Sequence, residues 1–173
     1  MKNIFILLSI GMISLSCESP DSSPQVIGFT ASENGKSNVL AGPSDILSVW
    51  ESYIDAHNSR DVEGIQALNS DEISVYGPAG EVIEGKEAHI EFLNQWFEAN
   101  NPNWTILWAI SNTGESNEYE EGVADFVTAG HELILNVEGQ DITVFQVIDA
   151  MISDGKVVSF NVYQQERGQA SNE

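Results

Sequence analysis

The spacing of apolar residues changes near Asn101, and this change most narrows the folds that the chain can adopt. Before that point apolar residues recur at the interval of one helix face. The spacing predicts a helix that starts after Pro43-Ser44-Asp45 and runs to about Ser59. It predicts two further helices, over residues 62–68 and 86–100.

Strand patterns occupy two short segments between the second and third helices and dominate the chain after Asn101. Runs typical of strands cover residues 72–76, 81–84, 104–111, 120–128, 142–152 and 157–164. Gly77-Pro78-Ala79-Gly80 is a turn sequence, and Asp154-Gly155 predicts a tight hairpin. Helices first and an antiparallel meander afterwards indicate the α+β class, with the helices packed on one face of a curved sheet. A ligand pocket between helices and sheet is the expected consequence.

The first residues are typical of a secretory signal. Lys2 is the only charge before Cys17, and an apolar run over residues 4–15 ends beside small residues. Residues 13–17 resemble the lipobox of bacterial lipoproteins, which predicts a signal peptide over residues 1–16 and lipidation of Cys17, the only cysteine in the chain. Ordinary signal-peptidase cleavage nearby is the alternative. Anchorage at the bacterial cell envelope, on the periplasmic or outer surface, follows from the lipid.

The predicted domain organisation continues from that cysteine. Residues 17–42 are rich in Ser, Pro, Gly and Asn and are expected to form a flexible tether. Residues 43–167 have the apolar content of one folded domain, and residues 168–173 are expected to be a disordered tail.

The net charge of the chain argues against polyanionic partners. The chain has 27 acidic and 6 basic residues, with a formal net charge of −21. Binding to nucleic acid or to anionic lipid depends on Lys and Arg, so neither is expected as a partner. Contact with a membrane is expected only through the lipid anchor.

The order of elements resembles the nuclear transport factor 2-like superfamily, which includes SnoaL-like polyketide cyclases, scytalone dehydratases and ketosteroid isomerases. The resemblance covers residues 46–166 and rests on Arg60-Asp61, Gly85-Lys86-Glu87 and Asp154-Gly155-Lys156-Val157. It implies a cone-shaped, mostly antiparallel sheet packed against three N-terminal helices. It also implies a domain that often pairs as a homodimer through the open face of the sheet.

Ketosteroid isomerases are the most similar members in function. The resemblance places Tyr53 where that group keeps its oxyanion-hole tyrosine, and Asp149 where it keeps a protonated aspartic acid. The general-base aspartate of that group is replaced here by Gly77, so ketosteroid isomerase activity is not expected. His57 follows Tyr53 by one helical turn and is a candidate base. Tyr53 and Asp149 are equally compatible with a buried structural pair.

The expected pocket is apolar and rich in aromatic residues. Strand alternation groups Asp149 with Phe145, Val147 and Met151. The remaining expected lining residues are Trp50, Val75, Gly77, Trp96 and Trp108, with Trp104 as an alternative to Trp108. His89 is expected to have a packing role and His131 to lie in a loop after Ala129-Gly130. The histidines lack metal-ligand spacing, so no metal or cofactor is expected.

Three functions follow from this sequence. The first is binding of a small apolar molecule with a carbonyl or phenol oxygen. The second is cofactor-independent isomerase, cyclase or dehydratase chemistry, with Tyr53 and Asp149 as an oxyanion hole. The third is a non-catalytic dimeric interaction module.

Overall fold

The computed structural model describes residues 23–33, 35–115 and 123–166. In chain order these residues form β1 (Val26–Ser32), β2 (Gly35–Ala41), α1 (Asp45–Ser59), α2 (Val62–Leu68), β3 (Asn69–Tyr76), β4 (Val82–Glu84), α3 (Lys86–Asn100), β5 (Asn103–Glu115), β6 (Val123–Val137), β7 (Gln140–Ser153) and β8 (Lys156–Glu166). The expected signal peptide, Cys17 and the tail at 168–173 lie outside the described residues. Among the described residues, no helix has the length and apolar character needed to span a membrane.

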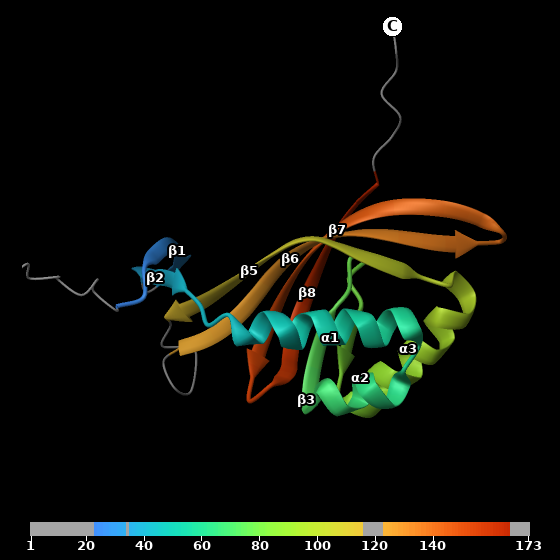
Figure 1. Cartoon of the computed structure of the whole chain (residues 1–173), viewed down its shortest axis with the longest axis horizontal. Helices are drawn as coiled ribbons and strands as arrows, with labels where there is room; N and C mark the ends of the chain where they lie inside the picture. Colours follow the sequence, from blue (N-terminus) through green and yellow to red (C-terminus); the bar gives the residue numbers. More distant parts are fainter. Residues whose placement is uncertain (1–22, 34, 116–122, 167–173) are drawn as a thin grey trace, which may run out of the picture.

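The strands form a single curved sheet in the order β1-β2-β5-β6-β7-β8-β3-β4. Neighbouring strands are antiparallel except β3 and β8, which are parallel. Register shifts between Ile106 and Trp108 and between Met151 and Ile152 are irregularities of the kind that bends a strand. The three helices lie together on one face of the sheet (Figure 1), which confirms the α+β prediction.

Local signals set the helix ends. Arg60 takes a left-handed conformation (φ 60°) after α1, and its guanidinium donates hydrogen bonds to the carbonyls of His57 (2.7 Å) and Pro102 (2.5 Å). The Asp61 side chain accepts a hydrogen bond of 2.9 Å from the Gly64 amide and caps α2. The predicted bounds of all three helices are confirmed.

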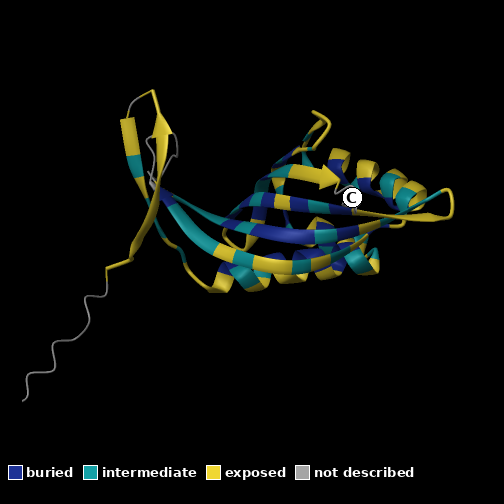
Figure 2. Ribbon diagram, turned by 90° about the horizontal axis from the view of Figure 1, so that it is seen from above, coloured by how far each residue is buried: buried dark blue, intermediate teal, exposed yellow. Residues whose placement is uncertain are grey.

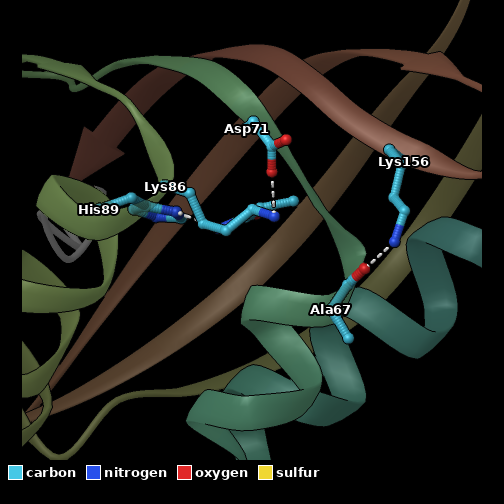
Figure 3. Close-up of polar contacts among 6 residues, drawn as sticks. Ala67, Asp71, Lys86, His89 and Lys156 are labelled. Carbon is cyan, nitrogen blue, oxygen red and sulfur yellow. Dashed lines mark hydrogen bonds and ion pairs between the residues drawn. The ribbon is translucent and has the colours of Figure 1, made fainter.

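Two lysines form polar contacts between helices α2 and α3 and neighbouring strands. Lys86, the first residue of α3, forms an ion pair with Asp71 on β3. Lys156, the first residue of β8, donates a hydrogen bond to the carbonyl of Ala67 in α2 (Figure 3). These contacts close the layer of helices against the β3 side of the sheet, where the candidate site lies.

The prediction of a flexible tether over residues 17–42 is wrong for residues 26–41. These residues form the β1–β2 hairpin, and Val39, Leu40 and Ala41 pair with β5. The hairpin lies beyond the helices at one end of the sheet and is largely exposed (Figures 1 and 2). The segment shows no sustained apolar period, and its strands form by pairing with each other and with β5, which a local sequence pattern does not reveal.

The predicted loop at His131 is also wrong. Strand β6 runs through Ala129, Gly130 and His131 without a break and continues to Val137, where Glu138-Gly139 turns the chain into β7. Gly130 suggested a loop, but a glycine stands in this strand because there is no room for a larger side chain. A Cβ at this position would lie 2.3 Å from the indole Nε1 of Trp108, which covers it.

Candidate functional site

A cavity of about 300 Å³ lies between the helices and the inner face of the sheet. It contains the predicted residues Trp50, Tyr53, His57, Val75, Gly77, Trp96 and Trp104. It is also lined by Ile54, Pro78, Ala79, Glu81, Ile83, His89, Phe92, Leu93, Leu135, Gln146, Ile148, Phe160, Val162 and Gln164. The walls are therefore mainly apolar and aromatic, with a few polar groups.

The predicted inner face of β7 is wrong. Gln146 and Ile148 line the cavity, and the buried residues of the strand alternate with the set Phe145, Val147, Asp149 and Met151. Because successive side chains point to opposite faces, that set lies on the outer face. Both sets are largely apolar, so sequence alternation alone does not choose between them. Trp108, Phe145 and Val147 instead line a second depression of about 230 Å³.

Tyr53 and Asp149 do not form a pair. The Tyr53 hydroxyl donates a hydrogen bond of 2.8 Å to Oδ1 of Asn69. The Asp149 carboxylate accepts a hydrogen bond of 2.6 Å from the Thr128 hydroxyl, across the outer face of the sheet. The predicted oxyanion hole is therefore absent from this geometry, and the hydroxyl hydrogen of Tyr53 is already used within the protein.

Asn69 extends the contact of Tyr53 to His89. Because its Oδ1 accepts from Tyr53, its amide nitrogen donates to Nδ1 of His89, 3.0 Å away. Burial, and to a lesser extent repulsion from His57, lowers the pKa of His89 to about 3, so the ring is neutral at neutral pH. Its proton must then be on Nε2, which has no protein partner among the described residues and can donate to a ligand.

His57 has the opposite arrangement. Its Nδ1 donates a hydrogen bond of 2.7 Å to the Tyr53 carbonyl. Burial lowers its pKa to about 4, although the bond to Tyr53 opposes this shift. The neutral ring therefore leaves Nε2 as a hydrogen-bond acceptor. The two rings lie 6.2 Å apart, centroid to centroid, on the same cavity, so one presents a donor and the other an acceptor.

A second polar group in the cavity comes from β7. The Trp104 indole donates to Oε1 of Gln146 (3.0 Å), and the Gln146 amide donates to Gln164 (2.9 Å). Asn69, Gln146 and Glu81 were not singled out in the sequence, because nothing local distinguishes them from ordinary polar strand or turn residues. Only the fold brings Gln146 and Glu81 to the cavity and Asn69 to its buried position between Tyr53 and His89.

His131 is buried and lies apart from this arrangement. Its Nε2 accepts a hydrogen bond of 3.2 Å from the Trp50 indole, and its Nδ1 has no well-formed hydrogen bond. Burial lowers its pKa to about 4, with partial opposition from the backbone of Ala129. Within the described ranges, no three His, Cys, Asp or Glu residues are grouped so that they could hold a metal ion.

Solved structures of other proteins have a similar fold. Among solved structures, the chain is similar to a candidate ketosteroid isomerase from Kribbella flavida DSM 17836, with 17% identity and a TM-score of 0.58 over 74% of this chain and 83% of the other. It is similar to a candidate SnoaL-like polyketide cyclase from Jannaschia sp. CCS1, with 16% identity and a TM-score of 0.55 over 70% and 86%. It is also similar to an LEH-like epoxide hydrolase from M. tuberculosis, with 12% identity and a TM-score of 0.57 over 70% and 84%.

These identities support a shared fold only. A search of curated proteins returned no match. The family model described as the SnoaL-like domain matches residues 50–160, which is more than half of the chain and includes His57 and His89 of the cavity. The chain therefore belongs to the SnoaL-like domain family, within the nuclear transport factor 2-like superfamily.

Proposed function

We propose that this SnoaL-like domain binds a small, largely apolar molecule that carries a carbonyl or phenol oxygen in the cavity between helices and sheet. The observation that carries the proposal is the pair of neutral histidines, His57 with a free acceptor and His89 with a free donor. A carbonyl oxygen can accept from His89. A phenol hydroxyl can accept from His89 and also donate to His57.

The walls of the cavity support a ligand with an apolar body. Trp50, Trp96 and Trp104 offer large aromatic surfaces, and the volume of about 300 Å³ is at the lower end of the range for small-molecule sites. Among the described residues that line the cavity there is no Lys or Arg, and His57 and His89 are neutral, so the bound oxygen is expected to be uncharged.

Binding is tested with a phenol and its methyl ether. A shortened chain of residues 18–173, which lacks Cys17 but retains every described residue, is titrated with 4-tert-butylphenol and 4-tert-butylanisole, with tryptophan fluorescence as the signal. The phenol is expected to bind about tenfold more tightly, because the ether cannot donate to His57 and leaves that buried acceptor without a partner.

A variant locates the effect at His57. His57→Phe keeps an aromatic ring in the same place but removes the acceptor, so the two ligands should bind to it with similar affinity. His131→Gln is the matched control, because His131 does not line the cavity and glutamine can still accept from the Trp50 indole. If neither ligand binds the wild type, or if both bind it equally tightly, this function is ruled out.

We further propose that the domain is held at the cell envelope by a lipid on Cys17. The support is the apolar run that ends at the only cysteine of the chain. Cells that express the full chain are labelled with a radioactive fatty acid. The wild type should incorporate label, and Cys17→Ala should not. Equal labelling of both would disprove the anchor.

A further inference from the structure

The charge that borders the cavity is negative. Glu81 is the only Asp, Glu, Lys or Arg residue among the described side chains that line it. The two lining histidines are neutral because burial disfavours their charged forms. A ligand in this cavity therefore meets one carboxylate and no cation.

The turn between β3 and β4 holds this carboxylate in place. The Gly77 amide donates to the Glu81 carbonyl at 2.9 Å, and the Ala79 amide donates to the carboxylate oxygen Oε2, also at 2.9 Å. A Cβ on Gly77 would lie 2.4 Å from that oxygen, so the carboxylate occupies the space beside the glycine. The Glu81 side chain lines the cavity, and its other oxygen, Oε1, forms no hydrogen bond with the described residues.

Aromatic rings form much of the remaining wall. Phe92 and Trp96 on α3 are stacked with centroids 6.4 Å apart, and Trp104 lies 5.5 Å from Trp96. Phe92 is partly exposed, which places it at the edge of the cavity. The face of an aromatic ring carries partial negative charge, so rings and carboxylate favour the same kind of ligand group.

We propose that the cavity selects a ligand with an organic cation, a tertiary or quaternary ammonium group on an apolar body, and that Glu81 is its counter-ion. This inference rests on the proposed function, because it concerns the ligand of the same cavity. An alkylated ammonium group contacts ring faces and a carboxylate and is more weakly hydrated than a primary amine. An anionic ligand would be opposed by Glu81 and by the formal charge of −21 on the chain.

Two ligands of nearly identical shape test the proposal. In 4-hydroxyphenyltrimethylammonium, a charged nitrogen replaces the central carbon of the tert-butyl group of 4-tert-butylphenol. Both are titrated into the shortened chain of residues 18–173 at neutral pH and low salt. The cation is expected to bind about fivefold more tightly than the neutral phenol, from the ion pair with Glu81 and the contacts with the ring faces together.

The variants assign this preference to the cavity. Glu81→Gln should reduce the difference to less than about twofold. Glu84→Gln removes an acid that is also exposed but does not line the cavity, and it should leave the preference unchanged. Phe92→Leu keeps an apolar side chain and should weaken binding of the cation more than binding of the phenol. Matching thermal unfolding of each variant establishes that the variants are folded.

Each outcome has a separate meaning. If the neutral phenol binds the wild type as tightly as the cation, the inference is wrong while the proposed function stands. If Glu84→Gln removes the preference as fully as Glu81→Gln does, the effect is one of overall charge and the inference is again wrong. If neither ligand binds, the proposed function fails and the inference fails with it.

Discussion

The protonation state of single side chains gives the cavity its chemistry. Tyr53, Asn69 and His89 form a chain of two hydrogen bonds, and each bond fixes the donor and acceptor roles of the next group. Burial also raises the pKa of Tyr53 well above its usual value, so its hydroxyl keeps its hydrogen. Tyr53 and His57 line the cavity, but the hydrogen bonds that Asn69 forms with Tyr53 and His89 were not indicated by the sequence.

The buried histidines make stability depend on pH. In the folded chain the pKa values of His57 and His131 are about 4, below the usual value of 6.5. Between these values the unfolded chain binds more protons, so the contribution to the free energy of unfolding is complete above pH 6.5 and decreases toward pH 4. The steepest expected slope is about 1.4 kcal/mol per pH unit for each histidine.

Urea denaturation of the wild type and of His131→Gln measures this slope. Gln146 and the carboxylates are the same in both proteins, and glutamine can still accept from the Trp50 indole. The variant should therefore lose less stability on acidification. At the steepest point, the slopes of the free energy of unfolding against pH should differ by about 1 kcal/mol per pH unit. Parallel curves for the two proteins would show that His131 does not titrate on unfolding.

At the scale of elements, agreement with the sequence follows from how local each signal is. The Asp61 side chain caps the start of α2, and the left-handed residues Arg60 and Asn101 end α1 and α3, so these signals act within one turn. The β1–β2 hairpin and the full length of β6 were missed because pairing with β5 and β7 stabilises them. Such pairing is not visible in a short window of sequence.

The whole molecule has an apolar outer face on the side of the sheet away from the helices. Trp108, Gly130, Val147 and Tyr163 are successive partners across β5, β6, β7 and β8, so they share one face. Trp108, Val147 and Tyr163 are 44%, 38% and 63% exposed, respectively. We propose that this face pairs two copies of the chain, because burying it would remove apolar surface from water.

Light scattering after size exclusion tests this pairing. The wild type should reach dimer mass at high protein concentration, and Trp108→Glu should remain a monomer. Higher salt should favour the dimer, because each copy carries a formal charge of −21 and screening reduces their repulsion. Phe29→Glu changes an exposed ring on the β1–β2 hairpin and serves as control. A wild type that stays monomeric throughout, or a dimer unaffected by Trp108→Glu, would contradict the proposal.

The sequence by itself determined the helices, the Asp154-Gly155 turn and the α+β class, because periodicity and turn chemistry act between residues near one another in the chain. The tertiary structure alone decided which face of β7 is buried, since both faces are apolar enough and pairing with β6 and β8 sets the register. It also decided the site, because Tyr53, Asn69 and His89 meet across separations of 16 and 20 residues. Their shared burial and hydrogen bonding, rather than any local pattern, set which atoms can meet a ligand.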